Sequence, residues 1–155
     1  MLYLVRHAKA GTRQEWDGDD ELRPLNKSGK RQAAAIARRL AKKDTTTLIS
    51  SPYLRCVQTL EPLAHLQREP VHIDDRLAEG SGFPAVMELF AALPDGAVLC
   101  SHGDTIPEVI DALVRRGCEL QSEPDWRKAT VWVLRRDDGE FTSAKCWPPP
   151  VDDHE

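Results

Sequence analysis

The sequence lacks long apolar runs. No stretch offers the roughly 18 or more consecutive apolar residues that a membrane-spanning helix needs. The apolar segment at residues 2–5 ends at Arg6 and is too short for the core of a secretory signal. We therefore expect a protein that works in the cytoplasm and has no membrane partner.

Metal-ligand patterns are also missing. The four cysteines form no C-x-x-C pair, and none has a histidine at ligand spacing, which argues against a structural zinc site. Scattered thiols in a chain without a signal predict reduced, mostly buried cysteines, with a secreted disulfide protein as the alternative. We expect no metal and no cofactor. The four cysteines are Cys56, Cys100, Cys118 and Cys146.

Positive charge is not in surplus. Lys and Arg number 21 against 25 Asp and Glu, which gives a net charge of -4. Proteins that bind nucleic acids or anionic membranes over a broad surface carry a basic surplus, so we expect neither partner. A local basic pocket for a small anion is still compatible with this balance. The length of 155 residues and the hydrophobic content of 41% suit one domain with a substantial core.

Strand-like and helix-like segments alternate along the chain. Short β-prone runs occur at residues 2–5, 46–50, 71–73 and 96–101, and helical patterns at residues 27–43, 52–66, 84–93 and 105–116. The Asp137-Asp138-Gly139 turn predicts a hairpin between strands at residues 130–136 and 140–146. We therefore expect an α/β fold, a three-layer α/β/α sandwich whose mostly parallel central sheet ends in an antiparallel C-terminal edge.

Two positions carry signals for the start of a helix. Asn26 is predicted to cap the helix at residues 27–43, and Ser51 followed by Pro52 is predicted to cap the next one. The last residues are rich in proline and acid. We expect one domain at residues 1–146 and a tail at residues 147–155.

Three polar segments follow predicted strands. They are Arg6 with His7, the S-P-Y-L-R run that ends at Arg55, and Ser101-His102-Gly103. Ligands of open α/β sheets bind outside the carboxyl ends of the strands, so these segments are expected to converge there. Two arginines, two histidines and the N-termini of helices suit a tetrahedral dianion such as phosphate.

The predicted anion-binding site also contains a candidate nucleophile. The imidazole of His7 offers a lone pair near neutral pH, and phosphoryl transfer needs mainly positioning and positive charge. A leaving oxygen also needs a proton, and Glu79 lies in the loop after the strand at residues 71–73.

Five motifs together resemble the histidine phosphatase superfamily, which is phosphoglycerate mutase-like in fold, and its SixA-like branch. The stretch at residues 8–25 also resembles the phosphatase half of mycobacterial MutT-type fusion hydrolases, although the chain shows no Nudix signature. The motifs are L-V-R-H-A (residues 4–8), R-P-L-N-x-x-G-x-x-Q-A (23–33), S-P-x-x-R-x-x-Q-T (51–59), R-L-x-E (76–79) and S-H-G (101–103).

The resemblance implies a metal-independent phosphatase and a role for each matched residue. His7 would be the nucleophile that becomes a phosphohistidine. Arg6, Arg55 and His102 would bind the phosphoryl group, and Glu79 matches the proton donor of the phosphoglycerate mutase-like members. SixA itself resembles this chain less well at Glu79, which favours an oxygen ester or an anhydride as the substrate.

Further residues are candidates for substrate binding. Gly103 belongs to the S-H-G motif, and Lys9, Arg13 and Arg23 lie on the long first loop, where they could contact a second phosphate or form an ordinary charged loop. Trp16 on the same loop could stack on a nucleobase or anchor the loop by packing.

The sequence leaves several functions open. The substrate could be a phosphohistidine-bearing protein, a small phosphate ester or a nucleotide-type anhydride. A phosphomutase is a related alternative. A phosphate-sensing module without catalysis is an alternative from a different class, and turnover of a phosphorylated substrate would separate the two.

Overall fold

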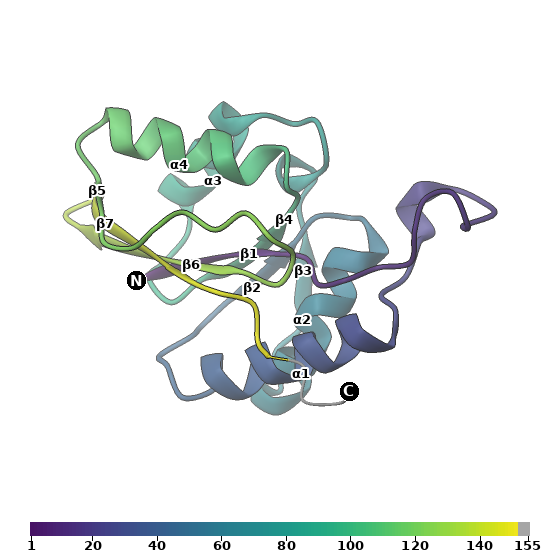
Figure 1. The fold of residues 1–155 in the computed structure, drawn as a ribbon. Coiled ribbons are helices and arrows are strands. Elements are labelled where there is room, and N and C mark those ends of the chain that lie inside the picture. The colour runs from purple at the N-terminus through teal and green to yellow at the C-terminus, as the bar shows by residue number, and fades with distance from the viewer. Residues whose placement is uncertain (152–155) are drawn as a thin grey trace.

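The computed structural model describes residues 1–151 as a single mixed β-sheet covered by helices on both faces (Figure 1). The strands are β1 (Leu2–Arg6), β2 (Leu48–Ser50), β3 (Val71–Ile73), β4 (Val98–Ser101), β5 (Glu119–Leu120), β6 (Val131–Asp137) and β7 (Glu140–Trp147). Their order across the sheet is β3-β2-β4-β1-β6-β7-β5. The strands from β3 to β1 are mutually parallel, whereas β6 runs antiparallel to both β1 and β7.

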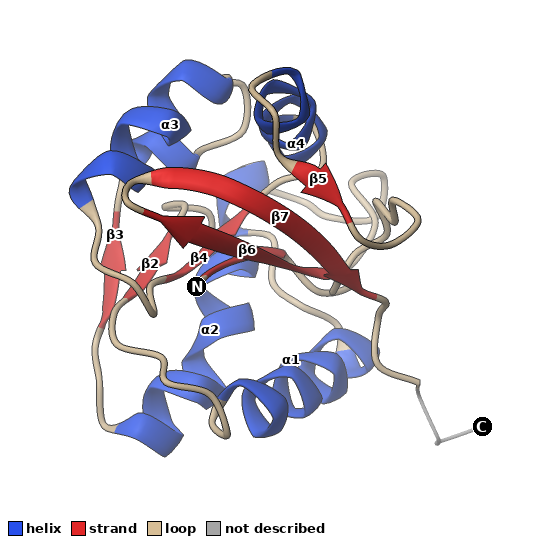
Figure 2. Ribbon diagram, turned by 90° about the vertical axis from the view of Figure 1, so that its left-hand side faces the viewer, coloured by secondary structure: helices blue, strands red, loops and turns tan. Residues whose placement is uncertain are grey.

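Four helices complete the three layers. They are α1 (Lys27–Leu40), α2 (Leu54–Gln67), α3 (Phe83–Ala92) and α4 (Thr105–Arg115). Helices α1 and α2 cover one face of the sheet, and α3 and α4 cover the other (Figure 2). A separate cluster of buried apolar side chains fills each side of the sheet. The predicted α/β sandwich, with its parallel centre and antiparallel C-terminal edge, is confirmed. No helix among the described residues is both long and apolar enough to cross a bilayer.

The two predicted helix caps have different outcomes. The Asn26 side chain accepts a hydrogen bond from the Gly29 N–H at 2.8 Å, so this cap is confirmed. The Ser51 cap is wrong, because α2 begins at Leu54 and Tyr53 stands at its N-cap position without a side-chain hydrogen bond. A tertiary contact of the Ser51 hydroxyl, described below, takes the place of the cap.

Trp147, the residue at which the tail is expected to begin, is the last residue of β7 and is buried. Its ring lies 6.1 Å from the Tyr3 ring, and the Arg39 guanidinium lies 3.6 Å above it. These contacts fix the strand end against β1 and α1. Residues 152–155 of the predicted tail lie outside the described residues.

The topology places three strand ends side by side. Arg6 at the end of β1 is in register with Ser101 at the end of β4, and Ser50 of β2 is in register with Cys100. The polar segments after these strands therefore leave the sheet at one edge, as predicted.

Candidate active site

A cavity of about 330 Å³ lies at this edge of the sheet. Side chains that are far apart in the sequence line it, including Arg6, His7, Arg55, Glu79 and His102. The structure thus brings together the five residues that the motifs singled out. Gly103, Arg13 and Arg23 also line the cavity.

His7 is oriented by its own main chain. Its Nδ1 lies 2.8 Å from the carbonyl oxygen of Ala8, an acceptor, so Nδ1 carries the proton and Nε2 keeps a free lone pair. The ring is only 5% exposed. Burial, together with the nearby charges of Arg6 and Arg55, lowers the pKa of His7 from 6.5 to about 3. His7 is therefore neutral at physiological pH, which is the form required of a nucleophile.

His102 lies beside His7, with ring centroids 5.5 Å apart. Its Nε2 is 2.8 Å from the Ser51 hydroxyl oxygen, and the edge of the Tyr53 ring packs against it. Cys56 lies beneath it, with Sγ 3.6 Å from Nε2. Its Nδ1 is buried and has no hydrogen-bond partner among the described residues, which leaves this nitrogen available to a ligand.

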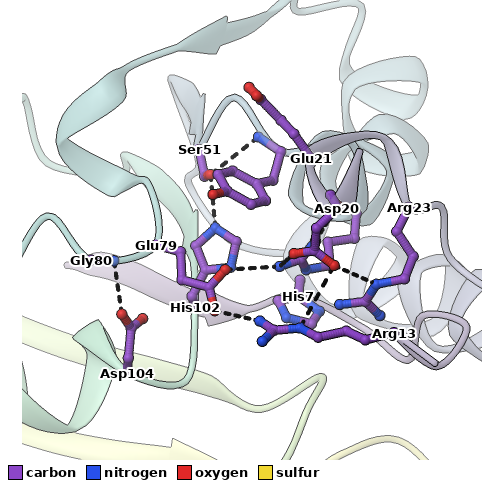
Figure 3. A network of polar contacts seen from close by, with 12 residues as sticks. His7, Arg13, Asp20, Glu21, Arg23, Ser51, Glu79, Gly80, His102 and Asp104 are labelled. Atoms are coloured by element: carbon purple, nitrogen blue, oxygen red, sulfur yellow. Dashed lines mark hydrogen bonds and ion pairs between the residues drawn. The ribbon is translucent and has the colours of Figure 1, made fainter. Parts of the chain in front are cut away.

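Arg55 is a fully buried cation held by two acids. Its guanidinium donates to the Asp20 carbonyl at 2.9 Å, to the Asp20 carboxylate at 3.2 Å and to the Glu79 carboxylate at 3.3 Å. Figure 3 shows the carboxylates of Asp20 and Glu79 together with the ion pairs of Arg13 and Arg23. A buried charge is costly without partners, so the two carboxylates keep Arg55 in place before a substrate arrives.

Arg6 also lines the cavity, and a main-chain carbonyl holds its guanidinium. One of its terminal nitrogens donates to the carbonyl oxygen of Trp126, and its buried Nε has no partner among the described residues. The backbone of Gly103 lies directly against the guanidinium, because a Cβ atom at this position would be 2.5 Å from the Arg6 Cζ. The glycine of the S-H-G motif therefore makes room for the arginine of the R-H motif.

The Q-T pair of the S-P-x-x-R-x-x-Q-T motif fastens α2 to the segment after β1. Thr59 donates its hydroxyl to the Arg55 carbonyl at 2.7 Å and accepts the Ala8 N–H at 3.0 Å. Gln58 accepts the Leu25 N–H at 2.8 Å. The two side chains thus set the spacing between Arg55 and the segment that carries His7.

The first loop is anchored to α1 where it begins and ends. The Lys9 N–H donates to the Gln32 side chain at 3.0 Å, and the Lys9 carbonyl accepts the Asn26 N–H at 3.1 Å. Only a glycine fits at residue 29, since a Cβ atom there would lie 1.9 Å from the Lys9 carbonyl oxygen. The N-x-x-G-x-x-Q spacing therefore holds the loop beside the cavity.

The remaining predicted residues occupy different places. Arg13 and Glu79 form an ion pair at 2.6 Å at the rim, and Arg23 is buried and donates to the Asp20 carboxylate at 2.9 Å. Lys9 is exposed and is not among the residues that line the cavity. Trp16 donates its indole N–H to the Asp19 carbonyl at 2.8 Å, which favours the loop-anchoring interpretation.

Three residues of this site were not predicted from the sequence. Asp20 holds the guanidinium groups of Arg55 and Arg23, and its place in the G-D-D-x-x-R-P-L stretch, three residues before Arg23, is a sequence signal that could have found it. Asp104 accepts the Gly80 N–H at 2.8 Å and so ties the loop of Glu79 to the His102 segment. Lys128 also lines the cavity, and no motif points to it.

The sequence matches a known protein family and a known protein. Residues 2–82 match the family model described as the histidine phosphatase superfamily, branch 1. A protein of Mycolicibacterium smegmatis named 8-oxo-(d)GTP phosphatase is 34% identical over 156 residues, which are 96% of this chain and 48% of that protein. The chain therefore spans about half the length of this curated relative.

Solved structures share the fold. The protein histidine phosphatase SixA complexed with tungstate superposes with a TM-score of 0.72 at 23% identity, over 91% of this chain and 92% of that one. YhfR of Bacillus stearothermophilus gives a TM-score of 0.73 at 16% identity, over 90% of this chain and 93% of that one. The family match, the relative and the site geometry agree, and the chain belongs to the histidine phosphatase superfamily.

Proposed function

We propose that this protein is a phosphatase that works through a covalent phosphohistidine at His7. The observation that carries the proposal is the orientation of the His7 ring. Its Nδ1 is occupied by the Ala8 carbonyl, and its free Nε2 shares one cavity with Arg6, Arg55 and His102. A neutral imidazole beside a cluster of cations and N–H donors suits attack on a phosphorus atom.

The reaction proceeds in two displacements. His7 Nε2 forms a bond to phosphorus while the bond from phosphorus to the leaving oxygen breaks. A water molecule, which gives a proton to the Glu79 carboxylate, then attacks the phosphohistidine. The P–N bond breaks, inorganic phosphate is released, and neutral His7 and protonated Glu79 are restored. Arg6, Arg55 and His102 stabilise the negative charge on the phosphoryl oxygens in both steps.

Glu79 is the proposed proton donor to the leaving group. Both of its oxygens accept hydrogen bonds from guanidinium groups of Arg13 and Arg55 before a substrate binds. A phosphoryl group that binds Arg55 removes one of these donors and places a dianion beside Glu79. The Glu79 oxygen released from Arg55 is then free to face the leaving group.

The proposed substrate class is a small phosphate ester or a nucleotide-type anhydride. The name of the Mycolicibacterium smegmatis relative, 8-oxo-(d)GTP phosphatase, supports a nucleotide. The presence of Glu79 supports an oxygen leaving group, which benefits more from a proton donor than an imidazole does. A phosphohistidine-bearing protein is the alternative, because the fold is shared with SixA.

Trapping of the intermediate tests the mechanism. The protein is mixed with a ³²P-labelled substrate, quenched in alkali to preserve phosphohistidine, and analysed for label on His7. His7→Ala should lose both the label and turnover, while His65→Ala, an exposed histidine on α2, should keep both. An aryl phosphate hydrolysed by His7→Ala at the parental rate would contradict the mechanism.

A substrate panel separates the classes. A phosphohistidine peptide, sugar phosphates, nucleoside mono-, di- and triphosphates and an aryl phosphate are compared by kcat/KM. Preference for the peptide would overturn the small-molecule assignment. Binding of phosphate analogues without turnover of any panel member would instead indicate a phosphate-sensing module.

We also propose that residues 1–146 form the catalytic domain, with Trp147 closing its last strand, and that the protein acts in the cytoplasm. The four cysteines are buried and free of disulfides, which is compatible with a reducing compartment.

A further inference from the structure

Lys128 is a cation of the cavity that no motif contains. It lies in the segment before β6, outside the residues matched by the family model, yet its side chain lines the same cavity as His7 and Arg55.

The segment around Lys128 is bonded to the end of β1. The Ala129 N–H donates to the carbonyls of Arg6 and His7 at 3.2 and 3.1 Å, and the Thr130 carbonyl accepts the Arg6 N–H at 3.0 Å. The Trp126 carbonyl accepts the Arg6 guanidinium. The backbone next to Lys128 is thus hydrogen-bonded to Arg6 and His7, the proposed cation and nucleophile of the site.

Backbone strain occurs at the next residue. Ala129 has φ of 66°, in the left-handed region that non-glycine residues rarely adopt, and it is completely buried. Such conformations are costly and concentrate at functional sites. The strain is tolerated where the chain turns to place Lys128 beside the cavity.

The charge of Lys128 is unmatched. Within residues 1–151 its ammonium group has no ion pair and no hydrogen bond, whereas Arg13, Arg23 and Arg55 each have a carboxylate partner. Burial and the charges of Arg6, Arg23, Arg55 and Lys9 lower the pKa of Lys128. A half-buried ammonium among other cations is unfavourable until an anion joins them.

We propose that Lys128 binds the transferred phosphoryl group directly, as a cation additional to Arg6 and Arg55. This inference rests on the proposed phosphatase function. The neighbours of Lys128 are the arginines that surround the phosphoryl position, so an oxyanion bound there would be its missing partner. An ammonium group acts as a compact point charge with three donors, which suits the equatorial oxygens of a phosphoryl group in transfer.

A role at the transferred phosphoryl group makes the effect independent of the substrate. Every substrate presents the same phosphoryl group to His7, so loss of Lys128 should lower kcat/KM by a similar factor for all of them. A lysine that recognised a second phosphate would instead affect only substrates that carry one.

The experiment compares Lys128→Met, Lys128→Arg and a control, Lys145→Met. Lys145 is exposed on β7 and does not line the cavity. The affinity for orthovanadate is measured by calorimetry, and kcat/KM is measured for an aryl phosphate and a nucleoside diphosphate. Lys128→Met should bind orthovanadate about 10- to 100-fold more weakly, as expected for the loss of a hydrogen bond between charged groups. Lys128→Arg should recover most of this affinity, and Lys145→Met should resemble the parent.

Two results would overturn the inference. One is orthovanadate affinity within twofold of the parent in a Lys128→Met protein that keeps the parental melting temperature. The other is a loss of kcat/KM confined to the diphosphate. If the parent itself forms no labelled phosphohistidine, the proposed catalytic function fails, and the orthovanadate affinities then show separately whether Lys128 is an anion ligand.

Discussion

The Ser51 hydroxyl oxygen lies 2.8 Å from Nε2 of His102 and accepts the N–H of Tyr53 at 3.2 Å. Because the Ser51 hydroxyl oxygen already accepts the backbone N–H of Tyr53, the hydroxyl is held beside Nε2 of His102. It keeps the His102 ring in one orientation. Nδ1 of His102 has no partner within residues 1–151, so in the proposed function it stays available to a phosphoryl oxygen. Ser51 is therefore a positioning residue that acts through His102.

Ser51→Ala should lower kcat about tenfold, since one hydrogen bond that orients His102 is lost. The KM for an aryl phosphate should change less, because the arginines remain. Steady-state kinetics measure both constants, and Ser51→Thr should restore much of kcat by returning the hydroxyl. Equal kinetics for Ser51→Ala and the parent, with the melting temperature unchanged, would show that the contact does not position His102.

The titration of His7 should appear in the stability of the protein. The folded-state pKa of about 3 lies below the ordinary value of 6.5, so between these pH values the unfolded state binds a proton that the folded state does not. The contribution of His7 is therefore complete above pH 6.5 and is lost as the pH falls towards 3. The free energy of unfolding should rise with pH in this window, by at most about 1.4 kcal/mol per pH unit from this one group.

Urea denaturation at several pH values between 4 and 7 measures this slope. His7→Gln cannot titrate, so its slope should be smaller than that of the parent in phosphate-free buffer. Parallel slopes for the two proteins would mean that His7 titrates normally when folded.

Gly103→Ala should displace the Arg6 guanidinium, because the added methyl carbon would lie 2.5 Å from Cζ. We expect kcat/KM to fall on the order of 10²-fold, as for the loss of one electrostatic donor to a transition state. Orthovanadate affinity and kcat/KM are measured together. Retention of both at parental levels would show that the cavity accommodates the methyl group without moving Arg6.

Glu79→Gln should be selective for the leaving group. An alkyl phosphate, which needs a proton on its leaving oxygen, should lose on the order of 10² in kcat/KM, and a nitrophenyl phosphate much less. The measurement is a series of esters ordered by the acidity of the leaving alcohol. A uniform loss across the series would assign Glu79 to the positioning of Arg13 and Arg55 instead.

The architecture could be predicted from local patterns because β1, β2 and β4 are short apolar runs followed by polar residues. The hairpin followed from Asp138 and Gly139, both of which adopt positive φ in the structure. Strand β5 was missed because its two residues have no pattern of their own and pair only with the edge of β7. The helix start at Ser51 was mistaken because its hydroxyl contacts His102 and the Tyr53 N–H, and α2 begins only at Leu54.

The convergence of His7, Arg55 and His102 could be predicted because parallel strands end at one edge of the sheet. The roles of these residues stay predictions until the kinetic tests are made. Lys128 could not be found in this way, since its position depends on the bonds of Ala129 to Arg6 and His7 across more than a hundred residues. Long-range backbone bonds of this kind leave no local sequence signal.

The carboxylates of Asp20 and Glu79 that hold Arg55 have a consequence for turnover. A phosphoryl dianion that binds Arg55 replaces the carboxylates of Asp20 and Glu79. Its net binding free energy is therefore the difference between the two sets of ionic contacts. The same exchange runs backwards after hydrolysis, when the carboxylates compete with inorganic phosphate for the guanidinium. In the proposed cycle, product departure is thereby assisted by the two segments that carry these carboxylates, and tight trapping of phosphate is avoided.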